Sequence, residues 1–543
     1  MRRFDAVIAG MGPTGVTLAN LLARRGWNVL IVDPAHEVYP LPRAITADHE
    51  VMRTFQAIGI ADEVAHESIP HPGSDYLGVD GGLIKTFYPA PPPNPLGWEQ
   101  NFLFYQPWLE ARLRRELERY GNVEQRLGTS LVDAAENTDS VVVVLERDGE
   151  TEHVEAEFLV GCDGARSRTR SLVEPTITDL DFDEWWVIVD ANLIADTELP
   201  PRATQYCQPS RPGTFIIGPG SLRRWEIKVL PSEDPQDFKD HAVLRRVLSH
   251  FVDVDALEIA RVAVYRFHAL VVDSWRRGRI LLAGDAAHQM PPFLGQGMCA
   301  GIRDATGLAW KLDAVAKRGW PEDVLDTYQA EMRPHVGEVV GLAKEFGKII
   351  GELDPDRASA RDTRLREERR LRPDPTRQQV IPPLSAGLIA SPPNVAAGAQ
   401  FPQPWVRDAS GDRVRLDEVL GDWFAVVSIE NDESGAGAGD DSGPLLESVC
   451  RALGARQVVV RRSTTRGNSR TATRNGDAAV ADVVDLDGTL VDWASRLGIS
   501  WAVVRPDRYV YGTATSHSTV LGLLEELCLR GEVLASEPVA ERH

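Results

Sequence analysis

Short apolar runs bounded by glycine or proline mark the buried strands of this chain. They lie at residues 4–9, 27–32, 158–161 and 280–283. Runs this short and this uniformly apolar are typical of strands covered on both faces, as in a parallel sheet. A helical pattern runs through Leu22 between the first two strands and ends at Gly26. The N-terminal region is therefore predicted to be a βαβ unit.

The middle of the chain is predicted to be rich in β-structure. Residues 69–97 are rich in proline and glycine, and an amphipathic helix is expected at 108–120. Residues 177–268 contain strand candidates at 185–190, 214–217 and 224–229. Tyr206, Phe215 and Trp225 in this region could line an apolar pocket, although core packing explains most aromatic residues equally well.

The C-terminal part is predicted to be a separate, smaller α/β unit. Charge runs and prolines at 354–394 indicate a helical linker, and strand and helix signals alternate beyond it. Residues 434–443 are predicted to be a flexible loop because no helix start follows them. The string DLDGT at 485–489 has the form of a phosphatase motif, but too little chain follows it, and a strand and turn are expected.

A dinucleotide fingerprint follows the first strand directly. GMGPTG at 10–15 opens the helix, and Asp33 ends the second strand. Glycines permit a tight turn and close approach of a pyrophosphate, whose charge the helix start favours. Asp33 would accept hydrogen bonds from the adenosine ribose. The pattern predicts nucleotide binding, and by itself leaves FAD and NAD(P) open.

Charged residues shortly after the fingerprint are the next candidates. Arg43 follows a proline-rich turn and could pair with a phosphate, although a surface arginine is an equal alternative. Asp48, His49 and Glu50 stand at a predicted helix start. Acids at such positions are usually caps, so a catalytic role for Asp48 or His49 is the less common outcome.

Two later turns complete the set of motifs. CDGARS at 162–167 follows a buried strand, and its plain interpretation is an Asp-Gly turn. GRILLAGDAAHQMPPFLGQGMCAG at 278–301 reads as a strand, a turn at Gly284-Asp285, a proline-interrupted loop and a helix entry. A carboxylate at the end of a parallel strand can bind a polyol, and amides at a helix start favour negative charge.

Composition narrows the class of protein. With 543 residues, two or three domains are expected. A net charge of −21 argues against nucleic acid or an anionic membrane as partner. The five cysteines show no CxxC or metal-ligand spacing, so no metal site and a reducing cytoplasm are expected. No segment approaches the roughly 18 apolar residues of a membrane span.

The three motifs, in this order, resemble those of the class A FAD-dependent aromatic monooxygenases. PRAITADHE, YQPWLE, RRWEIKV, GQGMCAGIRDATGLAWKL and VRPDRYVYG are similar to the 3-(3-hydroxyphenyl)propionate hydroxylase and phenol hydroxylase branch. The resemblance covers nearly the whole chain. It implies an α/β protein with a hydroxybenzoate-hydroxylase-like FAD domain, a β-sheet substrate domain and a C-terminal thioredoxin-like domain without CxxC.

The implied domains alternate along the chain. The FAD domain would comprise 1–72, 101–176 and 269–350, and the substrate domain 73–100 and 177–268. A helical linker at 351–393 and the thioredoxin-like domain at 394–543 would follow. The resemblance further implies that FAD is held noncovalently by Gly10, Gly12, Pro13, Thr14, Gly15, Asp33, Arg43, Gln106, Asp163, Gly284, Asp285, Pro292, Gly295, Gly297 and Met298.

Within that set, the resemblance implies that Arg43 and Gln106 contact FAD and that Asp285 contacts its ribityl chain. Asp163 would support the pyrophosphate side and the transient binding of NAD(P)H. Asp33 stands where relatives commonly have glutamate, a change that keeps the carboxylate. Asp48 and His49 are the candidates for activating the substrate.

The implied reaction is hydroxylation of a phenolic ring with NAD(P)H and molecular oxygen, through a flavin C4a-hydroperoxide. The expected partner is a small aromatic substrate, with a homodimer left open. Two alternatives remain. One is oxygenation of a polycyclic aromatic polyketide by hydroxylation or Baeyer-Villiger insertion. The other is a redox-inert FAD-binding protein that uses its C-terminal domain for interactions.

Overall fold

The computed structural model describes residues 1–430, 443–462 and 480–532; the loop predicted at 434–443 lies almost wholly outside them. The chain forms two compact units. The first comprises residues 1–90, 99–305 and 336–382, and the second comprises 91–98, 306–335 and 383–543. The division falls within the two long helices α7 (Gly297–Arg318) and α8 (Asp326–Gly351). The seven domain segments expected from the resemblance stay a prediction.

An eight-stranded sheet in the first unit carries the nucleotide fingerprint. Its main order is β17-β18-β11-β1-β2-β8, and β10 and β9 extend from β11 as an antiparallel hairpin. The strands are β1 (Arg2–Ala9), β2 (Val29–Asp33), β8 (Val123–Leu127), β9 (Ser130–Glu136), β10 (Val141–Arg147), β11 (Glu150–Gly161), β17 (Arg276–Arg277) and β18 (Ile280–Leu282).

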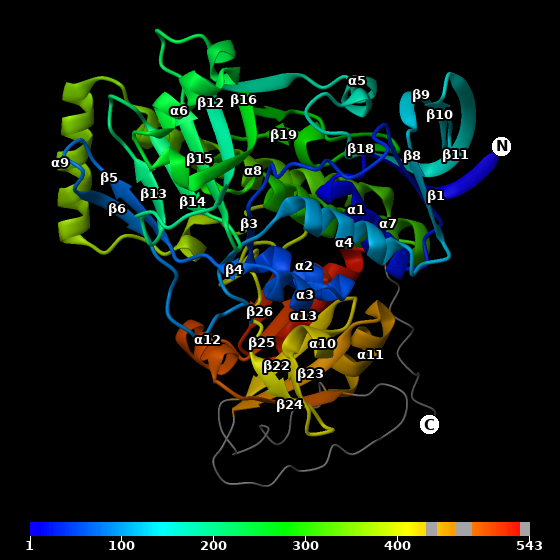
Figure 1. Cartoon of the computed structure of the whole chain (residues 1–543). Coiled ribbons are helices and arrows are strands. Elements are labelled where there is room, and N and C mark those ends of the chain that lie inside the picture. The colour runs from blue at the N-terminus through cyan, green and yellow to red at the C-terminus, as the bar shows by residue number, and fades with distance from the viewer. Residues whose placement is uncertain (431–442, 463–479, 533–543) are drawn as a thin grey trace, which may run out of the picture. The chain divides into compact units, whose positions relative to one another are not determined.

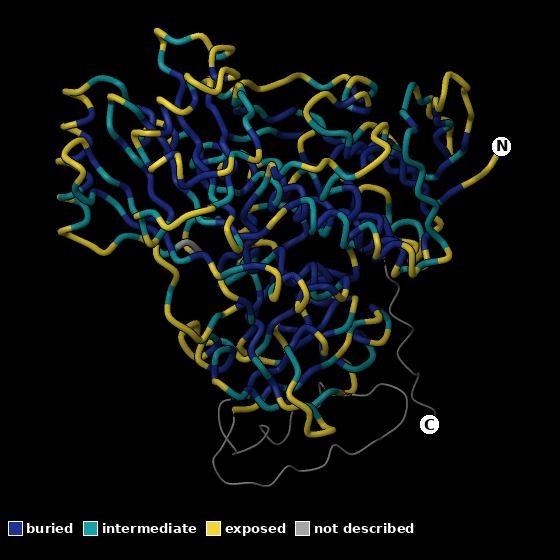
Figure 2. Tube along the Cα trace, viewed as in Figure 1, coloured by how far each residue is buried: buried dark blue, intermediate teal, exposed yellow. Residues whose placement is uncertain are grey.

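The centre of this sheet is parallel, as the apolar runs predict. β1 pairs in parallel with β2 on one side and β11 on the other, and β11 pairs in parallel with β18. Their inner residues are buried, which appears as dark blue through this part of Figure 2. Helices α1 (Pro13–Arg24) and α4 (Gln106–Leu117) pack against one another beside it (Figure 1).

A second eight-stranded sheet in the first unit has the order β19-β16-β12-β15-β14-β13-β5-β6. Figure 1 shows the early strands β5 and β6 beside β13, which comes much later in the chain. The strands are β5 (Ser74–Leu77), β6 (Leu83–Phe87), β12 (Ile177–Leu193), β13 (Ala203–Tyr206), β14 (Gly213–Ile217), β15 (Leu222–Lys228), β16 (Leu257–Val272) and β19 (His288–Gln289).

One face of this second sheet is apolar and forms a core. Val187, Phe215, Trp225 and Ile227 belong to a buried cluster completed by α6 (His241–Leu248), so the alternate residues of the same strands face the other way. The remaining elements of the unit are a small sheet of β3 (Thr46–Asp48), β7 (Asn101–Leu103) and β4 (Ile69–Pro70), the helices α2 (His49–Ile58), α3 (Ala61–His66), α5 (Arg168–Val173) and α9 (Pro355–Leu371), and short 3-10 turns.

The second unit is built on a seven-stranded sheet of order β21-β20-β24-β23-β22-β25-β26. The strands are β20 (Trp405–Arg407), β21 (Arg413–Arg415), β22 (Ala425–Glu430), β23 (Arg456–Arg462), β24 (Ala481–Asp485), β25 (Trp501–Val504) and β26 (Val510–Ala514). The helices are α10 (Leu416–Leu420), α11 (Gly443–Leu453), α12 (Thr489–Leu497) and α13 (His517–Arg530). This order is compatible with a thioredoxin-like domain, which stays a prediction.

The DLDGT string and the VRPDRYVYG motif both have structural roles in this second unit. Asp485 ends β24 and accepts hydrogen bonds from the backbone of Gly488 and Leu490, as a strand and turn require. Arg505 is fully buried and donates to Glu331 at 2.9 Å and to Asp507 at 2.6 Å. The conspicuous charges of the second motif thus satisfy one another inside the unit.

Candidate active site

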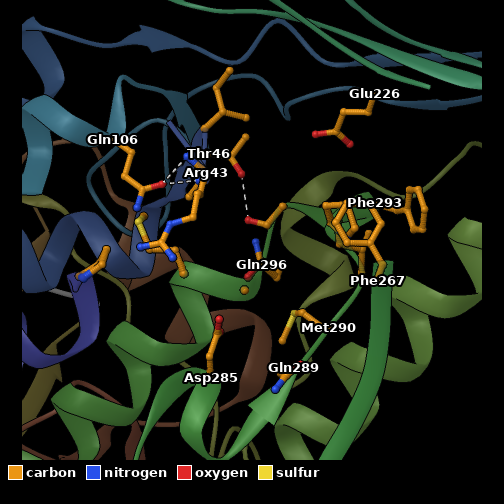
Figure 3. A pocket seen from close by; sticks show the side chains of 18 of the residues that line it. Arg43, Thr46, Gln106, Glu226, Phe267, Asp285, Gln289, Met290, Phe293 and Gln296 are labelled. Carbon is orange, nitrogen blue, oxygen red and sulfur yellow. Dashed lines mark hydrogen bonds between the residues drawn. The ribbon is translucent and has the colours of Figure 1, made fainter. Parts of the chain in front are cut away.

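A cavity of about 700 Å³ lies within the first unit. Its wall comes from the fingerprint turn, the turn after β11, the segment 285–298 and one face of the second sheet. Figure 3 shows Arg43, Gln106 and Asp285 toward one side, and Glu226, Phe267 and Phe293 toward the other. Of the residues predicted to hold FAD, every one except Gly15 and Gly284 lines this cavity.

The glycines of the fingerprint have different surroundings. A Cβ atom on Gly10 would lie 2.3 Å from the carbonyl oxygen of Cys162, and one on Gly15 would lie 2.0 Å from that of Gly10. These two positions allow β1, β11 and α1 to pack closely. Gly12 lines the cavity, and nothing lies within 4 Å of a Cβ atom built there. The open space at Gly12, beside the uncapped start of α1, fits a pyrophosphate.

Asp33 is held at the end of β2 by two backbone amides. Its carboxylate accepts hydrogen bonds from the amide of Met11 at 2.7 Å and from that of Ala35 at 2.8 Å. The first of these bonds ties the acid to the fingerprint turn. Each carboxylate oxygen can accept a further hydrogen bond at the cavity wall, and the binding of ribose hydroxyls by Asp33 stays a prediction.

Gln106 organises the turn that presents Arg43. Its side-chain oxygen accepts hydrogen bonds from the backbone amides of Arg43, at 2.8 Å, and Ala44. Figure 3 shows these two bonds as dashed lines. Arg224 reaches the same turn from the second sheet, donating to the carbonyl oxygens of Pro42 and Arg43. Gln106 therefore positions Arg43, whatever contact it also makes with a ligand.

Asp163 occupies the Asp-Gly turn in the manner of a helix-capping residue. Its carboxylate accepts hydrogen bonds from the Ser167 hydroxyl at 2.5 Å and from the Thr169 amide at 2.9 Å. Arg170 then joins this turn to the next one, because it donates to the carbonyl oxygens of Asp285 and Ala286. Asp163 therefore stabilises an ordinary Asp-Gly turn, and the same turn also lines the cavity.

Asp285 lies among buried neighbours, but its own side chain is exposed and lines the cavity. Desolvation by the surrounding protein raises its pKa, against the opposing influence of His288, Arg43 and Arg170. Its side chain makes no hydrogen bond to any other described residue, whereas Arg170 binds only its backbone oxygen. This carboxyl group is open to the cavity and has no protein donor, so both of its oxygens can accept hydrogen bonds from the hydroxyl groups of a bound polyol.

Asp304 is a residue of this site that the sequence analysis missed. It lies fully buried in α7 and accepts hydrogen bonds from the amide of Gly284 at 2.8 Å and from His288 Nε2 at 2.7 Å. It therefore fixes the turn that carries Asp285. The only sequence signal was an acid in an otherwise apolar stretch of a predicted helix, where acids are rarely buried unless paired.

The segment between the turn and α7 is held by a threonine. Gly295 has a φ of +62°, and a Cβ atom there would lie 2.2 Å from Thr46 Oγ1. Thr46 donates to the carbonyl oxygen of Gly295 at 2.9 Å. Pro292, Gly297 and Met298 line the cavity around it, so backbone is exposed to a ligand at the start of α7, which begins earlier than predicted.

Asp48 and His49 line the cavity, but in different chemical states. Asp48 caps α2 by accepting from the amide of Val51 at 3.0 Å, and its second oxygen pairs with Arg303. Burial alone would raise the pKa of Asp48, but Arg303 and His49 outweigh it and the pKa is lowered. Burial lowers the pKa of His49, so its imidazole is neutral at neutral pH. Their role in catalysis stays a prediction, and His49 is the better base of the two.

The three predicted substrate-binding aromatics do not line the cavity. Phe215 and Trp225 belong to the buried cluster on the opposite face of the second sheet, and Tyr206 packs against that cluster. The reason is strand alternation, which sends successive side chains to opposite faces. The aromatic residues that do line the substrate side come from elsewhere: Tyr76, Phe87, Tyr265, Phe267 and Phe293.

Two negative findings apply to the described residues. No group of three or more histidine, cysteine, aspartate or glutamate side chains is placed to hold a metal ion. No helix among them combines the length and the apolar character needed to cross a lipid bilayer.

Comparison with protein families gives two matches that together span most of the chain. Residues 3–343 match the FAD binding domain family, and residues 398–527 match the HcaD C-terminal domain family. The first match contains every residue predicted to bind the cofactor.

Curated relatives align over nearly the full length. A 3-(3-hydroxy-phenyl)propionate/3-hydroxycinnamic acid hydroxylase of Burkholderia vietnamiensis is 34% identical over 94% of this chain and 93% of the relative. A probable NADH-specific resorcinol 4-hydroxylase of Rhodococcus jostii is also 34% identical, over 99% of this chain and 97% of the relative.

Solved structures share the fold at lower identity. The flavin-dependent monooxygenase PieE in complex with FAD and substrate has a TM-score of 0.77 at 20% identity, and covers 98% of this chain and 99% of its own. Aklavinone-11 hydroxylase with FAD and aklavinone has a TM-score of 0.74 at 22% identity, covering 97% and 99%. The open cradle at Gly12 and the unpartnered carboxyl group of Asp285 fit FAD. The chain belongs to the FAD-dependent aromatic-ring hydroxylases, the class A flavoprotein monooxygenases.

Proposed function

We propose that this enzyme hydroxylates a small phenolic compound, using NADH or NADPH as reductant and molecular oxygen as the source of the inserted atom. The closely matching relatives are named as hydroxylases of hydroxyphenylpropionate and of resorcinol, both of which are phenols. A hydroxyl group on an aromatic ring is what these substrates share, and they differ in the second ring substituent. The buried, unpaired cysteines suit a reducing compartment, and we infer a cytoplasmic location.

The observation that carries this proposal is the two-sided character of the cavity described above. Toward the fingerprint it is lined by the glycine turn, Asp33 and Arg43, which suit a dinucleotide. Toward the second sheet it is lined by aromatic rings such as Phe267 and Phe293, which suit a ring-shaped substrate. A substrate and the redox end of a cofactor can therefore occupy adjacent parts of one cavity.

FAD, when bound, supplies the chemistry of electron transfer from the nicotinamide and of oxygen activation. The protein supplies position and environment. Phe293 contacts Trp186 and Phe182 edge to face, with ring centroids 5.0 and 5.8 Å apart, which fixes an apolar wall. Such a wall excludes water from the reacting ring and limits wasteful release of reduced oxygen species.

The direct test is a substrate panel with the purified, FAD-loaded enzyme. Phenols with and without carboxylate side chains, together with polycyclic aromatic compounds, are compared for stimulated NADH and NADPH oxidation. Products are analysed by mass spectrometry for the gain of one oxygen atom. The proposal requires at least one simple phenol that both stimulates oxidation and gains oxygen.

The other outcomes are equally informative. Oxygenation of polycyclic compounds alone would replace the small phenol by a polyketide-type substrate. A protein that binds FAD but oxidises NAD(P)H at the same slow rate with every compound would be a redox-inert flavoprotein, and the proposal would be abandoned.

A further inference from the structure

The cross-strand register of the second sheet places one row of side chains along the substrate side of the cavity. Glu226 on β15 is opposite Ile188 on β12 and Thr214 on β14. Thr214 is opposite Gln205 on β13, which is opposite Tyr76 on β5. All five residues line the cavity. The row is thus apolar at both ends and polar in the middle.

Glu226 is the unsatisfied member of this row. Only 5% of the residue is exposed, and its carboxyl group makes no hydrogen bond to any residue that the structure describes. The nearest charged atom is Arg224 Nη1 at 3.9 Å, which is too far for a hydrogen bond. Its neighbours Thr214 and Gln205, by contrast, bond to one another at 2.5 Å. Figure 3 shows the Glu226 carboxyl group directed into the cavity.

An unpartnered acid at this depth is unfavourable in the empty protein. Burial raises the pKa of Glu226; Arg224 and Arg261 oppose this effect and Asp190 adds to it. A buried carboxyl group without a donor loses its hydration and gains no hydrogen bond in return. A ligand that brings a hydroxyl donor to this point would supply that hydrogen bond, and a ligand that brings a second negative charge would be repelled.

The arginine side chains near Glu226 already form ion pairs with other residues. Arg224 donates to Asp190 at 2.7 Å and to the backbone oxygens of residues 42 and 43. Arg261 donates to the same carboxylate at 3.1 Å and to Pro42. Arg266, at the margin, pairs with Asp183. Of the arginines that line this cavity, Arg43 alone lies toward the fingerprint turn, where it influences Asp285.

Among the described residues, each arginine on this side already pairs with an aspartate, Arg224 and Arg261 with Asp190 and Arg266 with Asp183, and of their buried nitrogen atoms only Arg261 Nε is left without a partner. We infer that Glu226 binds a phenolic hydroxyl group of the substrate, and that the cavity selects uncharged hydroxylated aromatic compounds over aromatic carboxylates. This inference rests on the proposed function and narrows it, because the relatives named above include hydroxylases of both kinds of phenol.

The test uses two ligands of nearly the same size and shape, one anionic and one neutral: 3-(3-hydroxyphenyl)propionate and its primary amide. Their binding to the FAD-loaded enzyme, in the absence of NAD(P)H, is measured by titration calorimetry, with resorcinol as a small neutral reference. The amide and resorcinol are expected to bind at least roughly tenfold more tightly than the carboxylate. Equal affinities, or a preference for the carboxylate, would overturn the inference without any variant.

The variant Glu226→Gln keeps the size of the side chain and removes its charge. It is expected to weaken resorcinol binding several-fold and to bring the amide and the carboxylate to within about threefold of each other. Glu258→Gln, an exposed glutamate of β16 in the same sheet, is the matched control and should retain the wild-type preference. FAD content and circular dichroism establish that both variants are folded.

The results separate this inference from the proposed function. If phenols are hydroxylated but Glu226→Gln keeps the wild-type preference, the enzyme is a phenol hydroxylase and Glu226 does not select its substrate. If no phenol binds or gains oxygen, the proposed function fails and the assignment of Glu226 fails with it.

Discussion

Gly10 and Gly12 stand two residues apart in the fingerprint turn, yet a methyl group has opposite consequences at the two positions. Gly12→Ala places it in open space at a φ of −73°, which any residue adopts. The apoprotein should fold with unchanged stability, while the FAD content falls at least roughly tenfold because the pyrophosphate must approach the backbone here. Absorbance of the purified protein and urea unfolding of the apoprotein measure the two effects.

Gly10→Ala is the contrasting variant. Its φ of +102° and the 2.3 Å approach to the Cys162 carbonyl oxygen would strain the junction of β1 and β11. This variant should lower the free energy of unfolding even without FAD. Equal FAD loss and equal destabilisation in both variants would show that Gly12 is structural.

Asp285 gives a prediction in which stability and cofactor binding change in opposite directions. Desolvation by the surrounding protein raises its pKa, so the ionised carboxylate is disfavoured in the folded apoprotein, although the side chain is open to the cavity. Asp285→Asn should therefore slightly increase the free energy of unfolding of the apoprotein at pH 7. The gain should shrink as the pH falls and vanish below about pH 4, the pKa of an unfolded aspartate, where the carboxyl group is protonated in both states.

The same variant should retain FAD at least roughly tenfold less well, since a hydrogen bond to a charged group contributes about 1.5–3 kcal/mol. Unfolding curves across pH and FAD dissociation constants are the measurements. Asp139→Ala, at an exposed position, should change neither. Undiminished FAD affinity would remove Asp285 from the cofactor site.

At the scale of elements, a buried ionic group joins the second sheet to the turn that carries Arg43. Asp190 on β12 holds Arg224 on β15 and Arg261 on β16, and both arginines donate to backbone oxygens of that turn. Asp190→Asn leaves two buried guanidinium groups without their counter-charge. It should lower the free energy of unfolding by about 3–5 kcal/mol and weaken FAD retention.

The matched control is Asp183→Asn, which breaks the largely exposed pair between Asp183 and Arg266 in the same sheet. That change should cost no more than about 1 kcal/mol and leave FAD binding unaffected. If the two variants behave alike in urea unfolding, the buried group does not support the turn.

The sequence predicted the elements better than the faces they present. The apolar runs at 158–161 and 280–283 correctly indicated strands now seen in β11 and β18, because burial on both faces leaves a continuous apolar signal. The strand at Arg224 was also found. Apolar and charged residues alternate along this strand: Trp225 and Ile227 are apolar, and Arg224, Glu226 and Lys228 are charged. This alternation shows that the strand has one apolar and one polar face.

The prediction that the aromatic residues of this sheet line the pocket placed the wrong face of β15 toward the cavity. The tertiary fold puts the apolar face of β15 against α6 and turns the polar face to the cavity, and periodicity alone cannot tell which face meets a ligand. Asp304 and Glu226 were missed for a related reason. Each is a charged residue whose role depends on neighbours that are distant in the sequence and come close only in the folded chain.

At the scale of the whole molecule, the chain contains one dinucleotide fingerprint for two dinucleotides, the cofactor FAD and the reductant NAD(P)H. NAD(P)H must therefore react from a transient position at the flavin rather than from a Rossmann domain of its own. We expect NAD(P)H oxidation to be slow alone and to rise at least roughly tenfold with a compound that is hydroxylated, a barrier change of about 1.4 kcal/mol.

Stopped-flow measurement of flavin reduction, with and without that compound, provides the check. A phenyl ether that lacks the free hydroxyl group is the control ligand and should accelerate reduction far less. Identical reduction rates in all three conditions would exclude control by the substrate, although the enzyme could still be a hydroxylase.

The strand order of the nucleotide sheet has a consequence for synthesis of the protein on the ribosome. β18 completes the parallel centre of the sheet beside β11, yet it is made only after the whole second sheet except β19 has been translated. At about 5–20 residues per second, the edge of β11 waits for its partner for on the order of ten seconds. During that interval residues 159–161 of β11 keep an unpaired apolar edge, and the segment that carries Asp285 has not yet been made, so FAD cannot stabilise the nascent chain.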